Sequence, residues 1–185
     1  KSHSHPPDAD VDIWDVAEFF YIYRDPRDIA VSNAYYLANL APELGGKASF
    51  KDISTEERIM SYLEGITPDL RLLEGWFTNV HATKLSYETL LDSPTKCFAG
   101  IIEAKGFNVD PDALENAIAQ SSFRRMSGGR SPGEEDNNSV FRKGIAGDWV
   151  DYFSPSLKEY FKTTQSGRWN RLLIDYGYET NTNWQ

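Results

Sequence analysis

The 185-residue chain is poor in the residues that build disulfides and metal sites. It has one cysteine, Cys97, and three histidines, so no disulfide can form within the chain and a cysteine-rich metal site is excluded. It also lacks an apolar run near the length of a membrane span, and no basic-then-apolar signal segment opens it. These absences predict a soluble, cytoplasmic protein in which Cys97 is an ordinary core residue.

Positive charge is scarce as well. Lys and Arg total 19 against 28 Asp and Glu, which gives a formal net charge of −9 at pH 7. The global field therefore attracts neither nucleic acid nor an anionic membrane, and we expect neither as a partner. Any anion site must be local. The cations that could form one are Arg24, Arg27, Arg124, Arg125, Arg130, Arg142 and Lys143.

The most informative stretch covers residues 19–32. Five consecutive aromatic or β-branched residues, 19–23, predict a strand of a parallel sheet that is buried on both faces. Asp25 suits the N-cap of a following helix, and Asp28 suits the acid of a capping box. In open α/β sheets, ligands bind beyond the carboxyl ends of the strands, where a helix N-terminus favours phosphate. Arg24 is predicted at that edge.

A second stretch, residues 141–149, strengthens the case for an anion site. It places Arg142 and Lys143 before Gly144, and glycine lets backbone N–H groups turn toward an anion. A strand, an arginine and a capped helix occur together in many folds, so the first stretch alone does not decide the matter. Ser32, two turns into the first helix, could likewise bind the ligand or the carbonyls of its own helix.

Together the two stretches resemble the paired 3′-phosphate-binding motifs of the PAPS-dependent sulfotransferases. The first reads Tyr-x-x-Arg-Asp-Pro-Arg-Asp-x-Ala-Val-Ser and the second Arg-Lys-Gly-x-x-Gly-Asp-Trp. The resemblance implies an α/β fold with a parallel sheet flanked by helices, the P-loop-containing nucleotide hydrolase-like fold of that family. It also implies 3′-phosphoadenosine 5′-phosphosulfate (PAPS) as co-substrate and adenosine 3′,5′-bisphosphate (PAP) as product.

The resemblance further implies roles for nine residues. The ligands of the 3′-phosphate would be Arg24, Ser32, Arg142, Lys143 and the N–H of Gly144. Tyr87 lies in a segment similar to the family's Tyr-Glu-Asp-Met, and Ser121 and Phe123 resemble its Ser-Phe segment, so these three would lie at the adenine. The segment Lys1-Ser2-His3 resembles the family's Lys-Thr-His, with serine for threonine, and His3 would be the catalytic base.

The implied reaction is in-line transfer of the sulfuryl group to a hydroxyl or amine of a small-molecule acceptor, and it needs no metal. Three interpretations stay open: a sulfotransferase, a non-catalytic 3′-phosphonucleotide binder or inactive fragment, and an unrelated phosphotransferase. The last is disfavoured because the chain lacks a Gly-x-x-x-x-Gly-Lys-Ser/Thr loop. The segment 36–63 is expected to line an acceptor pocket, again by resemblance.

The chain also has no match to the family's phosphosulfate loop, which resembles Pro-Lys-Ser-Gly-Thr. The resemblance therefore covers about the C-terminal two-thirds of a family member, since a βα unit typically needs 30 or more residues. We expect a single domain, residues 1–185, that lacks the N-terminal βα unit. A piece of a longer protein is the favoured explanation, because a parallel sheet without its central strand would leave backbone groups unpaired.

Local signals predict several further elements. Ser54 and Glu57 form a capping box, and Ser93, Asp110 and Ser154 each precede a proline at a helix start. A helix is also expected from Thr67-Pro68 onward.

Three further segments are predicted from pattern. Residues 81–88 suggest a second strand, and the spacing of apolar residues over 169–177 indicates an amphipathic helix on the core. The breaker-rich segment 127–138 is either a lid over the ligand or a solvated connector.

Overall fold

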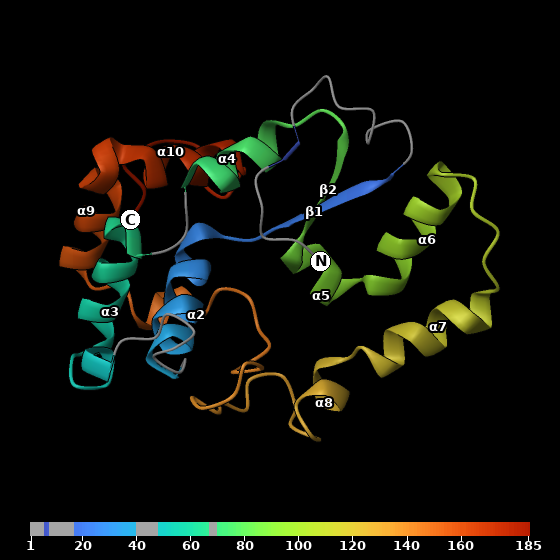
Figure 1. Cartoon of the computed structure of the whole chain (residues 1–185), viewed down its shortest axis with the longest axis horizontal. Helices are drawn as coiled ribbons and strands as arrows, with labels where there is room; N and C mark the ends of the chain where they lie inside the picture. Colours follow the sequence, from blue (N-terminus) through green and yellow to red (C-terminus); the bar gives the residue numbers. More distant parts are fainter. Residues whose placement is uncertain (1–5, 8–16, 40–47, 67–69) are drawn as a thin grey trace. The chain divides into compact units, whose positions relative to one another are not determined.

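The computed structural model describes residues 6–7, 17–39, 48–66 and 70–185. These residues form two compact units, one drawn from 1–85 and 147–185 and the other from 86–146 (Figure 1). The single-domain interpretation stays a prediction. The predicted catalytic base, His3, and the predicted helix start at Thr67-Pro68 lie outside the described residues.

The first unit contains the sheet. Strand β1 (Phe19–Tyr23) pairs with strand β2 (Ala82–Ser86), and helix α2 (Pro26–Asn39) follows β1 after a two-residue turn (Figure 1). The predicted class, α/β with a parallel sheet flanked by helices, is confirmed. The second strand is shorter than expected, because the Ser86 hydroxyl accepts a hydrogen bond from the N–H of Thr89 at 3.1 Å. That bond caps helix α5 and ends the strand.

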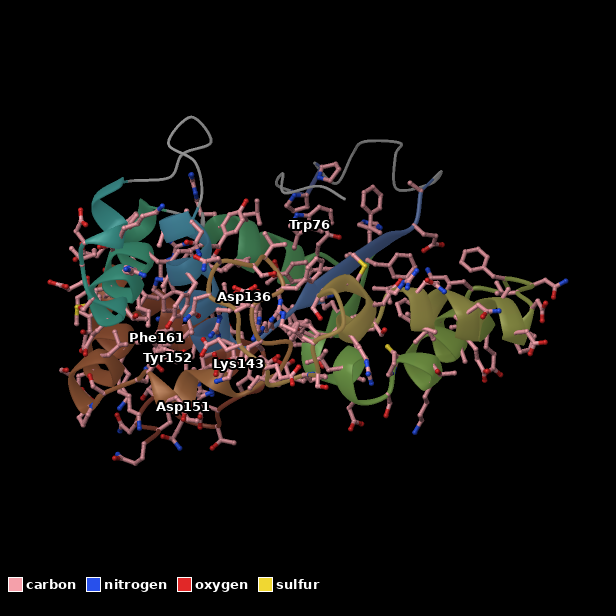
Figure 2. All side chains as sticks on the ribbon, turned by 90° about the horizontal axis from the view of Figure 1, so that it is seen from below. Trp76, Asp136, Lys143, Asp151, Tyr152 and Phe161 are labelled. Carbon is pink, nitrogen blue, oxygen red and sulfur yellow. The ribbon has the colours of Figure 1, made fainter. Side chains whose placement is uncertain are left out.

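Strand β1 is not buried on both faces among the described residues, and this prediction was wrong. Phe20 and Ile22 are 43% and 54% exposed. The alternate side chains are half-buried and face other aromatic rings: Phe19, Tyr21 and Tyr23. Trp76 of helix α4 (Leu70–Thr78) lies 5.9 Å from Phe19, measured between ring centroids (Figure 2). An unbroken run of aromatic and β-branched residues has no polar–apolar alternation that could have distinguished the two faces.

The core of the first unit lies among its helices. Helix α2 packs on α3 (Thr55–Ser61), and α9 (Pro155–Thr163) packs on both α3 and α10 (Arg168–Asp175). Short helical turns complete the unit at Ala48–Lys51 (η2), Tyr62–Ile66 (η3), Asp148–Asp151 (η4) and Thr164–Gly167 (η5). The largest fully buried hydrophobic side chains are Trp169, Tyr62, Phe161, Ile59, Leu63, Leu157, Leu172, Leu173 and Val31.

Helix α10 confirms the amphipathic pattern predicted over 169–177. Trp169, Leu172 and Leu173 are buried, and the indole N–H of Trp169 donates to the carbonyl of Leu63 at 2.9 Å. The helix ends at Asp175, two residues before Gly177, whose φ of 81° is favourable for glycine. The indole N–H of Trp184 also donates to Oδ1 of Asn170 at 2.8 Å, so apolar burial and buried hydrogen bonds hold the last helix to the core.

The helix starts predicted at Ser54, Ser93, Asp110 and Ser154 are all present, and at three of them the side chain forms a cap bond. Ser54 and Glu57 form both bonds of the capping box. The Ser154 hydroxyl and the Asp110 carboxylate accept from the N–H groups of Leu157 and Asp112, respectively. Ser93 makes no side-chain cap bond. It also ends helix α5, where its N–H donates to Thr89, so its backbone conformation is set by the preceding helix.

The second unit is a chain of four helices followed by turns. They are α5 (Tyr87–Asp92), α6 (Pro94–Ala104), α7 (Pro111–Gln120) and α8 (Phe123–Met126), and each packs against the next. None of these four helices has a buried residue, and Cys97, predicted in the core, is half-buried. Across the described part of the chain, every helix is too short or too polar to cross a membrane.

Candidate functional site

Arg24 and Ser32 belong to the first unit. Arg24 lies between the end of β1 and the start of α2, and Ser32 is half-buried in α2. The Arg24 side chain is 20% exposed, and its Nη2 lies 3.2 Å from Oδ2 of Asp28. The arginine thus keeps access to solvent at the carboxyl end of the strand while a buried carboxylate orients it.

The Asp28 carboxylate joins the two sequence motifs within the first unit. Its Oδ2 accepts from the N–H of Gly147 at 2.8 Å, and its Oδ1 accepts from the N–H of Trp149 at 2.9 Å. The side chain is fully buried. Asp28 therefore satisfies two donors at the start of the turn η4, a long-range role that the capping-box interpretation had not included.

Arg27 was a candidate cation of the anion site, and the structure corrects this. Its side chain is only 4% exposed and forms ion pairs with Asp25 at 2.7 Å and Glu179 at 2.8 Å. The guanidinium carbon lies 3.7 Å from the Trp149 ring centroid and 4.7 Å from that of Trp184. Arg27 is thus a structural cation, held by two carboxylates and two aromatic rings.

Asp25 is buried beside Arg27 at the start of helix α2. Its Oδ1 accepts from the backbone N–H of Arg27 at 2.8 Å, which confirms Asp25 as a capping residue. Burial raises the pKa of the Asp25 carboxyl, and the hydrogen bonds and positive charge of Arg27 act in the opposite direction. The Asp25 carboxylate and the Arg27 guanidinium thus stabilise each other as a buried ion pair.

The other described candidates belong to the second unit. Arg142 forms an ion pair with Glu135, and its side chain is 9% exposed. Lys143, labelled in Figure 2, is half-buried. Tyr87 is half-buried as the first residue of α5, and Ser121 is exposed at the end of α7. Arg142 is therefore paired with a carboxylate of its own unit, and its role as a phosphate ligand stays a prediction.

The structure brings Gly144 and Phe123 into direct contact. A methyl group added to Gly144 would lie 2.2 Å from Cδ2 of Phe123 and 2.5 Å from its Cγ. Gly144 also has a φ of 65°, a backbone conformation that residues other than glycine rarely adopt. Two candidate donor-binding residues that lie far apart in sequence therefore pack together, and only glycine fits beneath the ring.

Arg130 is another candidate cation with a different role in the structure. Its guanidinium donates to the carbonyls of Phe141 at 2.6 Å, Arg142 at 2.8 Å and Glu134 at 2.9 Å. The residue is half-buried. Sequence reasoning did not find this function, because a single arginine among glycines and serines gives no sign that its partners are carbonyl groups.

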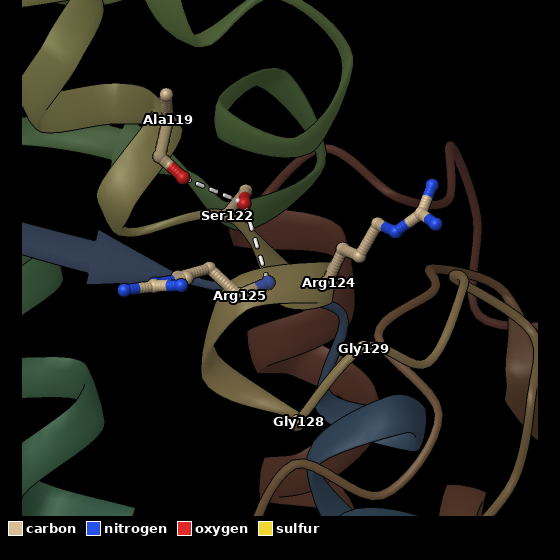
Figure 3. Close-up of a pocket in the computed structure, with 6 residues that line it drawn as sticks. All are labelled: Ala119, Ser122, Arg124, Arg125, Gly128 and Gly129. Carbon is tan, nitrogen blue, oxygen red and sulfur yellow. Dashed lines mark hydrogen bonds between the residues drawn. The ribbon is translucent and has the colours of Figure 1, made fainter.

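A pocket with a volume of about 600 Å³ lies beside α8 (Figure 3). Ser122 at its wall caps α8 by accepting from the N–H of Arg125, and the side chains of Arg124 and Arg125 point in opposite directions. The lining residues are Ala119, Ser122, Arg124, Arg125, Gly128 and Gly129. None of the predicted donor-binding residues that the structure describes is in this lining.

Comparison with known proteins places these motifs in a family. A model of the sulfotransferase domain matches residues 1–169. The chain belongs to the sulfotransferase family. Human sulfotransferase 2A1 is 26% identical to this family member over 163 residues, which is 78% of this chain and 54% of the relative. Bovine sulfotransferase 1E1 is 25% identical over 177 residues, which is 87% of this chain and 58% of the relative.

This sulfotransferase-family chain thus spans little more than half the length of these curated relatives. Its fold is similar to that of mouse sulfotransferase SULT7A1 complexed with PAP, with a TM-score of 0.63 and 22% identity over 90% of this chain and 65% of the other. A retinol dehydratase complexed with androsterone and PAP has a TM-score of 0.60 and 23% identity, over 94% of this chain and 50% of the other. The predicted sulfotransferase fold is confirmed.

Replacing Asp28 with alanine should destabilise the first unit. The change leaves two buried N–H groups without an acceptor, so we expect the free energy of unfolding to fall by about 3–5 kcal/mol. Urea unfolding followed by tryptophan fluorescence measures it, since Trp149 lies at this contact. Asp175→Ala, at an exposed position, is the control and should change stability by less than about 0.5 kcal/mol. Equal effects of the two changes would contradict the assigned role of Asp28.

Gly144→Ala should cost more stability than Gly106→Ala. The two glycines have φ angles of 65° and 67°, but an added Cβ meets the Phe123 ring only at Gly144. Left-handed backbone costs alanine about 1–2 kcal/mol at both positions. The clash should add roughly 1–3 kcal/mol at Gly144. Chemical unfolding followed by far-ultraviolet circular dichroism compares them, and equal losses would show that the ring does not constrain Gly144.

Proposed function

We propose that this chain is the donor-binding part of a PAPS-dependent sulfotransferase, which transfers the sulfuryl group of PAPS to a hydroxyl or amine of a small molecule and leaves PAP. The observation that carries the proposal is the contact of Phe123 with Gly144. It sets a ring able to stack on a base directly against the Arg-Lys-Gly segment. A nucleoside 3′-phosphate presents a base and a phosphate close together, and this pairing is complementary to both.

The 3′-phosphate is the group that this segment would bind. It carries close to two negative charges and several strong acceptor oxygens. Each charge-assisted hydrogen bond from Arg142, Lys143 or the N–H of Gly144 would contribute about 1.5–3 kcal/mol. In the structure Arg142 is paired with the carboxylate of Glu135, and a bound phosphate would take the place of that acceptor. Arg24 and Ser32 are proposed as further ligands of the same phosphate.

The adenine would be bound mainly by stacking. Base stacking on an aromatic side chain contributes about 1–3 kcal/mol where it has been measured in nucleic-acid complexes. We assign this role to Phe123, with Tyr87 and Ser121 as further contacts of the base. A phosphate site of this kind would distinguish a 3′-phosphorylated nucleotide from ATP, which has no 3′-phosphate.

The sulfuryl transfer itself would need a base to accept the acceptor's proton. His3 is proposed for this task on the resemblance of Lys1-Ser2-His3 to the family's segment. The alternative is a protein that binds 3′-phosphonucleotides without catalysis; it would keep the phosphate ligands and would not depend on His3. Cytoplasmic location and the single domain stay predictions alongside this proposal.

Removing either arginine should weaken binding of PAP. For Arg24→Ala and Arg142→Ala we expect a loss of about 2–5 kcal/mol, the range for truncating one partner of a buried charge pair. Calorimetric titration measures the affinity, with adenosine 5′-monophosphate and ATP as ligand controls. Arg171→Ala, at an exposed position of α10, removes the same charge and should leave the affinity unchanged. Unaltered affinity in both Arg24→Ala and Arg142→Ala would overturn the site.

Replacing His3 with alanine should separate binding from turnover. A general base typically contributes 10²–10⁴-fold to the rate, so we expect a loss of about that size with PAP affinity retained. The assay uses the full-length protein, PAPS and a panel of phenols, alcohols and amines, with His81→Ala at an exposed position as control. Near-normal turnover would remove His3 from catalysis. If the unaltered protein binds PAP tightly but shows no turnover, the result would favour the alternative, a non-catalytic 3′-phosphonucleotide-binding protein.

A further inference from the structure

Arg130 contacts the backbone at the start of the proposed phosphate segment, residues 142–144. Two of its guanidinium nitrogens donate to the carbonyls of Phe141 and Arg142, which immediately precede Lys143, and one of them also donates to Glu134. Hydrogen bonds to a charged donor are stronger than neutral ones. A single side chain thus links two backbone segments that are several residues apart in the sequence.

The backbone around Arg130 adds two bonds of its own. The N–H of Gly133 donates to the carbonyl of Lys143 at 2.8 Å, and the N–H of Asp136 donates to that of Arg142 at 3.0 Å. Segments 130–136 and 141–143 therefore run side by side. We call these two segments the clasp. The clasp has little apolar burial, so polar bonds must determine where its residues lie.

Arg130 also reaches the proposed base-stacking ring. Its guanidinium carbon lies 5.5 Å from the centroid of Phe123, which is the ring that packs on Gly144. An arginine at this distance from an aromatic face is attracted by it. Arg130 therefore contacts both elements of the proposed donor site in the second unit, the phosphate segment and the ring.

We propose that Arg130 is a positioning residue that holds the clasp, and through it Arg142, in the arrangement that recognises a 3′-phosphate. This inference rests on the proposed donor binding. The planar fork of arginine suits the task because it directs several N–H groups in fixed directions, toward Phe141, Arg142 and Glu134. Its effect on the ligand passes through Arg142 and the neighbouring backbone.

The decisive comparison is between two nucleotides. PAP and adenosine 5′-monophosphate differ by the 3′-phosphate, so a residue that positions the phosphate ligands should affect the binding of PAP much more than that of adenosine 5′-monophosphate. In the full chain, Arg130→Ala should weaken the binding of PAP by about tenfold to hundredfold, which is the scale of one lost hydrogen bond to a charged group. Binding of adenosine 5′-monophosphate should weaken by less than about fivefold, since this nucleotide lacks the 3′-phosphate and would lose only the support that Arg130 gives the Phe123 ring.

Two further variants sharpen the comparison. Arg130→Lys keeps the positive charge but loses the planar guanidinium, so its PAP affinity should be close to that of Arg130→Ala. Lys96→Ala removes one positive charge from an exposed position of α6 in the same unit, and its PAP affinity should be unchanged. Equal weakening of both nucleotides by Arg130→Ala would mean a general structural role and would overturn the proposal. Full rescue by lysine would overturn the need for the fork.

A double-mutant cycle tests whether Arg130 acts through Arg142. If it does, adding Arg130→Ala to Arg142→Ala should cost little further PAP affinity, because the group being positioned is already gone. Fully additive losses would overturn the assigned route.

Hydrogen exchange separates this inference from the proposed function. Without ligand, the amides of Gly133 and Asp136, which are bonded across the clasp, should exchange at least about tenfold faster in Arg130→Ala. Failure of the unaltered chain to bind PAP would reject the donor site alone. Unchanged exchange at both amides would reject the clasp role of Arg130, whatever the binding result.

Discussion

The buried carboxylate of Asp28 is the interaction on which the first unit depends most. It accepts the N–H groups of Gly147 and Trp149, residues that lie 119 and 121 positions later in the chain. The same carboxylate orients Arg24, which stays partly exposed. One side chain therefore fixes the start of α2, the turn η4 and a candidate phosphate ligand. Leaving its two N–H partners unpaired would cost more than any exposed ion pair contributes.

The two arginines of the first motif differ in burial: Arg27 is buried and Arg24 is partly exposed. Arg27 is stacked on Trp149 and Trp184 and paired with Asp25 and Glu179, and these contacts offset the cost of burying a cation. The Arg24 side chain, by contrast, is 20% exposed and keeps donors within reach of solvent. The motif thus combines one structural arginine with one candidate for binding.

The second unit depends on local polar contacts more than on a core. Its four helices have no buried residue, and their ends are defined by side chains such as Ser86, Asp110 and Ser122. Arg130 and the bonds of the clasp give the Arg-Lys-Gly segment its conformation. Such a segment has few apolar contacts to compensate for a lost bond. Its geometry should therefore respond sharply to single polar substitutions.

The sequence by itself determined the features that depend on neighbours within a turn or two. The capping box at Ser54, the helix starts at Asp110 and Ser154 and the final amphipathic helix all follow from local chemistry, and each is present in the structure. The motifs also indicated the α/β fold and the family, because short segments specify how a chain leaves a strand and enters a helix. The roles of the candidate site residues remain predictions.

Only the tertiary structure decided which groups meet across long separations. The exposed face of β1 at Phe20 and Ile22 depends on which elements cover the strand. Asp28 and Arg27 each have a partner more than a hundred residues away, Gly147 and Glu179 respectively. The packing of Phe123 on Gly144 likewise joins residues with no shared local pattern. Periodicity and capping rules operate along one element. These rules carry no information about contacts between elements. Which side chains are buried or hydrogen-bonded there depends on how the elements pack in the folded chain.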